Sequence, residues 1–160
     1  MAFPQRLVPL SLLLLALTLY SVSPHGIVRR KIYVIRSTGP HGLVLDATNP
    51  SLLTVQYFTG FKPQLWTFEP GSKPGFYYII NESQGKVLDY NRPASWNLVL
   101  ANRDNSLHQQ WNLDSTGKIT NAALSKNIDI WGATFTPGTQ VGLWHDGDYP
   151  NQKFALEEKS

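Results

Sequence analysis

Residues 64–69 read QLWTFE, and related phrases return as QQWNLD at 109–114 and as QKFALE at 152–157. The three glutamines that open these phrases are 45 and then 43 residues apart. A fixed period of about 40 residues is typical of one supersecondary unit that is used several times. The sequence therefore predicts three structural copies, and differences among the copies point to positions that serve function rather than folding.

Each copy contains the same series of short segments. An aromatic or β-branched run comes first, then an apolar pair that ends in aspartate, then a third apolar segment, and finally the glutamine phrase. Short apolar runs separated by Gly, Pro, Asn and Asp are typical of strands joined by turns. The pattern predicts an all-β chain, and closure into a β-trefoil of three four-stranded repeats removes most open strand edges. The predicted repeats cover about 31–70, 75–114 and 115–158.

The aromatic residue two places after each glutamine is predicted to be buried. Alternate residues of a strand point to the same side, so Trp66, Trp111 and Phe154 share a face with their glutamines. Burial of one such ring stabilises a fold by about 1.5–3 kcal/mol. A buried glutamine amide must also find hydrogen-bond partners. The phrase is therefore interpreted as a signature of the scaffold and not of a binding site.

The N-terminal residues are expected to direct secretion. Arg6 is followed by an uncharged, leucine-rich run over 7–20, and small residues at 21–23 suit a cleavage site. The run is shorter than the roughly 20 apolar residues of a membrane-spanning helix. We therefore expect a signal peptide at 1–23, a secreted, extracellular domain at 24–160 and no stable membrane insertion after cleavage. An uncleaved anchor is the alternative.

Composition excludes several classes of function. The chain has no cysteine, which excludes thiol catalysis and thiolate metal sites. Its four histidines show no metal-ligand spacing, so neither a metal nor another cofactor is expected. The basic residues are scattered, so nucleic acid is not an expected partner. The sequence contains no serine nucleophile elbow. Asp146 and Asp148 are interpreted as a polar loop or a cation site. The chain is therefore not expected to be an enzyme.

Asn81 begins an Asn-Glu-Ser sequon and is a glycosylation candidate.

Three longer stretches add to the repeat pattern: GLVLDA at 42–47, NSLHQQWNL at 105–113 and LWHDGDYPNQKF at 143–154. With the phased glutamine phrases, they make residues 31–157 resemble the ricin B-type lectins. The resemblance implies a β-trefoil that binds carbohydrate, usually galactose or N-acetylgalactosamine. In that family each repeat can form a sugar pocket. Its parts are the Asp of the second strand, an aromatic residue at the end of the third, and an Asn just before the glutamine.

By this resemblance the third copy is the predicted carbohydrate site, because it holds every element: Asp129, Trp144, Asn151 and Gln152. The ring would stack on the apolar face of a sugar. The carboxylate and amide would pair with its hydroxyls, each of which costs about 1–3 kcal/mol if buried unpaired. Gly142 stands where many relatives have a polar residue, which removes one hydrogen bond. Three further residues could line this pocket or serve packing alone: Trp131, His145 and Tyr149.

The first copy is predicted to be a weaker site. It offers Asp46, Gln56 and Phe58, but Pro63 replaces the asparagine. Proline brings neither a side-chain amide nor a backbone N–H.

The second copy is predicted to be silent. It keeps Asp89 but has Ala101 at the aromatic position and His108 at the asparagine position. An aspartate after an apolar strand often forms a turn with its own backbone. Asp89, present without a stacking ring, favours that structural role, and the same role remains open for Asp129.

The expected function is that of a lectin whose partners are glycans or glycoproteins. A single shallow pocket binds weakly, so oligomerisation is possible as a source of avidity. The alternative is a secreted β-trefoil with decayed sugar sites that binds a protein partner, either as a protease-inhibitor-like protein or as a structural module.

Overall fold

The computed structural model describes residues 19–26 and 28–159, so most of the expected signal peptide, residues 1–18, lies outside the described residues. The described chain is all-β, as predicted. Its helical structure is limited to five 3-10 turns: η1 Pro40–Gly42, η2 Lys62–Gln64, η3 Leu107–Gln109, η4 Trp131–Ala133 and η5 Pro150–Gln152. None of these turns is long and apolar enough to cross a membrane.

The strands form a two-stranded and a twelve-stranded sheet. The smaller sheet is β1 Tyr20–Val22 with β2 Val28–Arg30. The larger sheet contains β3 Ile32–Ser37, β4 Val44–Asp46, β5 Thr54–Gln56, β6 Trp66–Pro70, β7 Tyr77–Asn81, β8 Val87–Tyr90, β9 Leu98–Ala101, β10 Trp111–Leu113, β11 Ile119–Asn121, β12 Asn127–Ile130, β13 Val141–Trp144 and β14 Phe154–Lys159.

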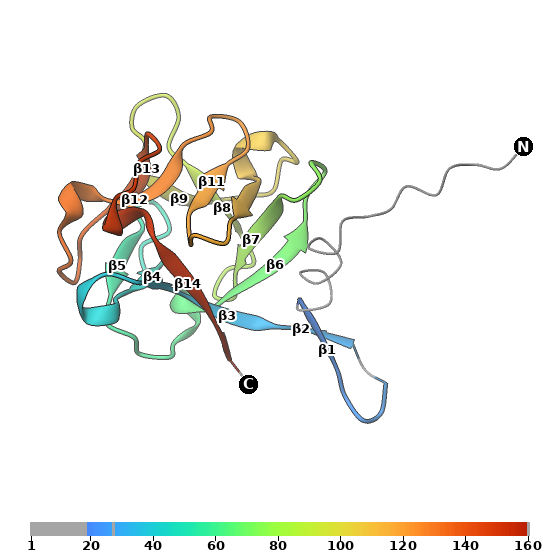
Figure 1. Cartoon of the computed structure of the whole chain (residues 1–160). Coiled ribbons are helices and arrows are strands. Elements are labelled where there is room, and N and C mark those ends of the chain that lie inside the picture. Colours follow the sequence, from blue (N-terminus) through green and yellow to red (C-terminus); the bar gives the residue numbers. More distant parts are fainter. Residues whose placement is uncertain (1–18, 27, 160) are drawn as a thin grey trace, which may run out of the picture.

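Three units of four strands follow one another, namely β3–β6, β7–β10 and β11–β14. The outer strands of each unit belong to a barrel, and the middle two form a hairpin: β4–β5, β8–β9 or β12–β13. The last strand, β14, pairs antiparallel with the first barrel strand, β3, from Phe154↔Ser37 to Lys159↔Ile32 (Figure 1). This pairing closes the barrel. The predicted β-trefoil is confirmed.

The hairpins of different units touch one another. Isolated bridges join Thr54 to Gln140 and Asn97 to Gly142. The hairpin β12–β13 of the third unit therefore lies against the first and second units. Residues of the second unit can reach the site that the third unit builds.

The aromatic residues of the three phrases lie in the core, as predicted. Trp66, Trp111 and Phe154 are all buried. The indole N–H of Trp66 donates to the Leu45 carbonyl at 3.3 Å, and that of Trp111 donates to the Leu88 carbonyl at 3.1 Å. Each tryptophan is thus tied to the second strand of its own unit. The phenyl ring of Phe154 has no N–H, so this side chain fills the equivalent place by packing alone.

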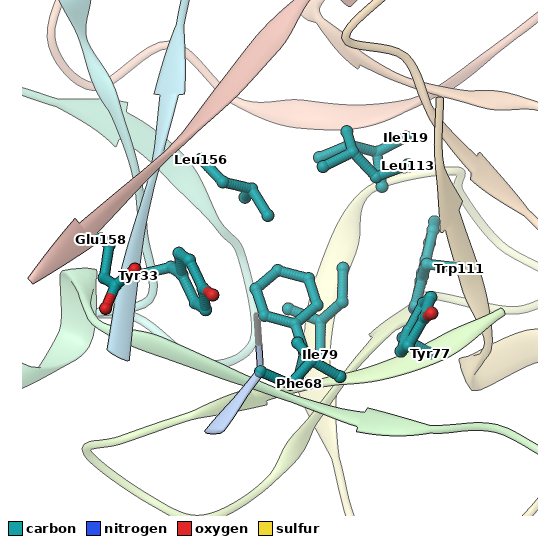
Figure 2. Close-up of a pocket in the computed structure, with 10 residues that line it drawn as sticks. Tyr33, Phe68, Tyr77, Ile79, Trp111, Leu113, Ile119, Leu156 and Glu158 are labelled. Atoms are coloured by element: carbon teal, nitrogen blue, oxygen red, sulfur yellow. The ribbon is translucent and has the colours of Figure 1, made fainter. Parts of the chain in front are cut away.

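The barrel has an apolar cavity of about 360 Å³ at one end. Side chains of the barrel strands converge on it, among them Tyr33, Phe68, Tyr77 and Leu156 (Figure 2). Leu19 also lines this cavity and is only 4% exposed. Its carbonyl accepts the backbone N–H of Lys31 at 2.7 Å. A residue within the expected signal peptide therefore contributes to the core.

Candidate functional site

A buried glutamine connects two segments of the third unit. The Gln152 side-chain N–H₂ donates to Asp129 Oδ2 and to the His145 carbonyl, both at 2.9 Å. Because Gln152 is fully buried and does not line the pocket above it, it acts as a positioning residue. The contact of Gln152 with sugar stays a prediction, and its burial favours an indirect role. The other units repeat this glutamine–aspartate clamp with Gln64 to Asp46 at 2.8 Å and Gln109 to Asp89 at 3.0 Å.

Asp129 and Asn151 meet at the floor of the pocket. One Asn151 N–H₂ group donates to Asp129 Oδ1 and to the Ile130 carbonyl, both at 2.9 Å. These bonds use both N–H groups of the Asn151 side chain, so its amide oxygen is left as an acceptor. Asp129 is 4% exposed, and each of its oxygens accepts one side-chain bond and keeps a lone pair. Burial raises the pKa of Asp129, and the bonds from Gln152 and Asn151 partly offset that rise.

Aromatic rings form the walls of this pocket, which has a volume of about 400 Å³. Trp144 is 46% exposed and meets Trp131 edge to face, with 5.8 Å between ring centroids. Tyr149 is also exposed and lines the same pocket. The structure thus brings together Asp129, Trp144 and Asn151, and it adds Trp131 and Tyr149, which the sequence left between binding and packing roles. His145 does not line the pocket.

Gly142 makes room for Trp131. It lies opposite Asp129 in the β12–β13 pairing. A Cβ atom on Gly142 would lie 2.3 Å from the Trp131 ring and 2.7 Å from the Trp96 carbonyl. The Trp131 indole N–H donates to Asn97 Oδ1 at 2.7 Å, which fixes the ring over the glycine. The signal in the sequence was a glycine inside a strand, which often marks a close approach of another group.

The first unit differs from the expectation in its register. Asp46 pairs with Thr54, and Asp129 pairs with Gly142, so Thr54 and Gly142 hold equivalent positions. Two residues further along each strand, Gln56 therefore occupies the place of Trp144. Phe58 lies two residues further along the chain.

Phe58 does not line the first-unit pocket, and its role as a stacking ring stays a prediction. Its ring instead lies under two cations, with Arg36 at 5.5 Å and Lys159 at 4.4 Å from its centroid. Asp46 and Gln56 do line a wide depression, together with the exposed rings of Tyr57 and Phe61.

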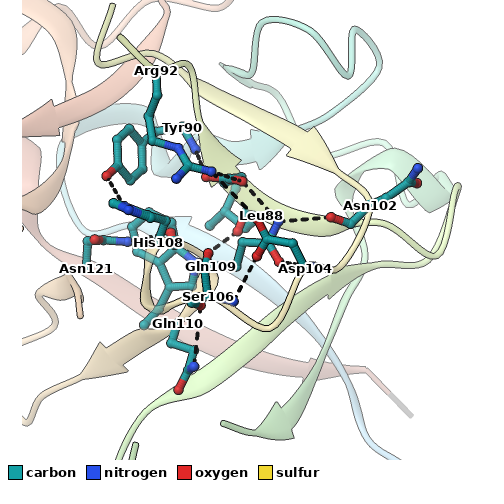
Figure 3. A network of polar contacts seen from close by, with 12 residues as sticks. Leu88, Tyr90, Arg92, Asn102, Asp104, Ser106, His108, Gln109, Gln110 and Asn121 are labelled. Carbon is teal, nitrogen blue, oxygen red and sulfur yellow. Dashed lines mark hydrogen bonds and ion pairs between the residues drawn. The ribbon is translucent and has the colours of Figure 1, made fainter. Parts of the chain in front are cut away.

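The second unit fills the equivalent place with its own side chains (Figure 3). Arg92 forms an ion pair with Asp89 at 3.4 Å and a second with Asp104 at 3.8 Å. The Tyr90 hydroxyl is hydrogen-bonded to Nδ1 of His108. Ala101, which occupies the place of Trp144, offers no ring for stacking.

Asn81 is an internal anchor of the fold. Its side chain is fully buried, and its N–H₂ donates to the Pro63 carbonyl at 3.0 Å. Its Oδ1 accepts the Ser83 N–H at 3.1 Å. Asn121 repeats this arrangement in the next unit with the His108 carbonyl at 2.8 Å. A nitrogen held in this way is inaccessible in the folded domain, and glycosylation at Asn81 stays a prediction from the sequon alone.

The family described as "Ricin-type beta-trefoil lectin domain-like" matches residues 62–144, just over half of the 160 residues. No curated protein matches the chain. The matching solved structures include a designed threefold symmetric protein, ThreeFoil, at 23% identity and a TM-score of 0.70, covering 78% of this chain and 96% of that one. The C-half of an earthworm R-type lectin in complex with GalNAc is 21% identical at a TM-score of 0.65, covering 81% and 99%. The Macrolepiota procera ricin B-like lectin in complex with lactose is 24% identical at a TM-score of 0.67, covering 80% and 95%.

Some similar structures are parts of larger proteins. This chain covers 18% of the chain of a mosquitocidal holotoxin and 32% of an exo-beta-1,3-galactanase from Clostridium thermocellum. All these likenesses lie below 25% identity, so they show the fold alone.

Proposed function

The chain belongs to the ricin-type beta-trefoil lectin domain-like family, and from this premise we propose that it is a secreted lectin for glycans that contain galactose or N-acetylgalactosamine. The third unit is the principal site. The observation that carries the proposal is the convergence of Asp129, Trp144 and Asn151 on one open pocket.

The chemistry of this pocket suits a pyranose sugar. The apolar face of the sugar stacks on the exposed indole of Trp144. Two of its hydroxyls donate to the free lone pairs of Asp129, and another donates to the Asn151 amide oxygen. Affinity near the millimolar range, about −4 kcal/mol, is typical of such a small contact. Two of the similar structures are complexes with GalNAc and with lactose, which supports this ligand class.

The acidic residues near the pocket support binding without catalysis. Lys118 lies 2.7 Å from Asp146 and Lys153 lies 2.5 Å from Asp148. Each lysine donates a hydrogen bond that lowers the pKa of its aspartate. A general acid in glycoside hydrolysis needs a raised pKa, so neither carboxylate suits that role. Asp129 has a raised pKa, but it is the single acidic residue that lines the pocket in the described part of the chain, and glycoside hydrolysis uses a pair of carboxylates. We therefore assign the pocket to recognition.

Substitution of Trp144 by alanine tests the proposal with little risk to the fold, because this ring is largely exposed. We expect the affinity for lactose, measured by calorimetric titration, to fall at least tenfold, about 1.4 kcal/mol. Leu107→Ala is the matched control, since Leu107 is an apolar residue of the second unit that is 44% exposed. Leu107→Ala should bind lactose as the original chain does.

Equal lactose affinity of Trp144→Ala and the original chain would contradict the assignment to the third unit. Absence of binding to galactose, N-acetylgalactosamine and lactose alike would contradict the lectin proposal itself and would favour a protein partner.

A further inference from the structure

A lysine lies beside the sugar pocket without an acidic partner. Lys126 immediately precedes β12, and its ammonium is 3.3 Å from both ring nitrogens of His145. It also lies 5.2 Å from the centroid of the Trp96 ring. No ion pair joins Lys126 to a carboxylate in the described part of the chain. The other lysines around this end of the third unit, Lys118 and Lys153, are neutralised by Asp146 and Asp148.

The second unit holds this lysine in position. The Trp96 carbonyl accepts the Leu143 N–H at 2.8 Å, which fixes Trp96 against strand β13. One face of the Trp96 ring stacks on Tyr90, with centroids 6.1 Å apart. Lys126 is half-buried as a result, and a partly desolvated cation attracts an anion more strongly than a fully hydrated one.

The cation is adjacent to the stacking ring of the pocket. The exposed His145 ring contacts both groups. Its two nitrogens lie 3.3 Å from the Lys126 ammonium, and its centroid lies 5.6 Å from that of Trp144. A substituent that extends across His145 from a sugar stacked on Trp144 would reach the Lys126 ammonium.

We propose that the third-unit pocket extends across His145 to Lys126 and prefers galactosides that carry an anionic substituent. This inference rests on the proposed function. The neutral ring occupies the pocket formed by Asp129, Trp144 and Asn151, and the anion pairs with Lys126. The anion is either the carboxylate of an attached acidic sugar or a sulfate ester, which share the same negative charge and oxygen acceptors. Trp96 acts as a positioning residue for the lysine.

The test compares lactose with sialyllactose and with sulfated galactose on the original chain and on Lys126→Gln. We expect the original chain to bind at least one anionic glycan about tenfold more tightly than lactose, and Lys126→Gln to lose that preference while its lactose affinity is unchanged. The preference should weaken as salt is raised, because a pair near the surface is screened. The comparison of sialyllactose with sulfated galactose shows whether the site favours a carboxylate or a sulfate ester.

Two further variants make the outcome decisive. Lys86 holds the same place before β8 in the second unit, so Lys86→Gln is the matched control and should keep the preference. Lys126→Arg retains the charge and should also keep it. Lactose binding with no anionic preference, or a preference that survives Lys126→Gln, would overturn this inference and leave the proposed function intact. No binding to any of the three glycans would overturn both.

Discussion

The three aspartates differ in which groups occupy their carboxylates. In the first unit Asp46 Oδ1 accepts the Thr48 backbone N–H at 2.7 Å, and in the second Asp89 Oδ1 accepts the Tyr90 backbone N–H at 2.7 Å. Asp129 Oδ1 is instead bonded by the Asn151 side chain. Asp46 and Asp89 therefore shape their own turns, whereas Asp129 is oriented by neighbouring side chains toward an open pocket.

The raised pKa of Asp129 predicts acid-sensitive binding. A protonated carboxyl loses an acceptor for a sugar hydroxyl, so lactose affinity should begin to fall at a higher pH than the titration of an ordinary aspartate would give, about 3.9. The pH dependence of the folding stability has the opposite sign. A carboxyl with a raised pKa favours the folded state when protonated, and that contribution is lost as the pH rises through the folded pKa. Acid should therefore weaken lactose binding while the contribution of this carboxyl to the stability of the fold increases.

Lactose titrations and thermal unfolding from about pH 7 to pH 4 separate the two effects. Asp129→Asn, which carries no ionisable group there, should bind weakly with a flat pH profile. A lactose affinity in the original chain that stays constant until the protein unfolds would contradict the assignment of Asp129.

At the scale of elements, the strands could be predicted from the repeat, and the grouping of Asp129, Trp144 and Asn151 from the family resemblance, but strand register could not. The segment 54–58 reads TVQYF, and in a strand over this whole segment Gln56 and Phe58 would share one face. In the structure the strand ends at Gln56. Sequence pattern alone cannot choose between two such placements. The pairing of Val44 with Gln56 decides it. The role of Trp131 was hidden for a related reason, because its contact with Gly142 depends on how β13 packs against the second unit.

The close fit between Gly142 and Trp131 gives a prediction for the β12–β13 hairpin. Gly142→Ala places a methyl group against a tryptophan ring and a backbone carbonyl, so we expect a loss of about 1–3 kcal/mol in the free energy of unfolding. The displaced ring should also weaken lactose binding. Urea unfolding and calorimetry measure the two effects. Thr54→Ala alters the equivalent position of the first unit and should leave lactose binding unchanged; a Gly142→Ala variant as stable as the original chain would speak against the packing argument.

At the scale of the whole molecule, the hairpin β1–β2 adds a feature that the threefold repeat does not contain. Leu19 packs over the apolar end of the barrel, although the sequence placed the start of the domain at residue 24. Signal-peptide patterns describe how a segment is recognised during export, and they carry no information on whether a residue also fits a cavity. The contact of Leu19 with the core could not be predicted for that reason.

Removal of the Leu19 side chain should therefore destabilise the barrel. In a chain that retains this residue, we expect Leu19→Ala to lower the free energy of unfolding by about 2 kcal/mol, since a buried leucine would be truncated. Val22→Ala, which shortens an exposed side chain of the same hairpin, should have almost no effect. Chemical denaturation of both variants provides the measurement, and equal stabilities would show that Leu19 does not seal the cavity.

The glutamine–aspartate clamp is the same in all three units, yet the pockets above it are not. Folding and recognition thus depend on different residues of one repeat. The second unit keeps these bonds although its own side chains fill the equivalent place. The number of sugar sites on such a scaffold can therefore be changed through the residues above the clamp while the trefoil itself stays constant.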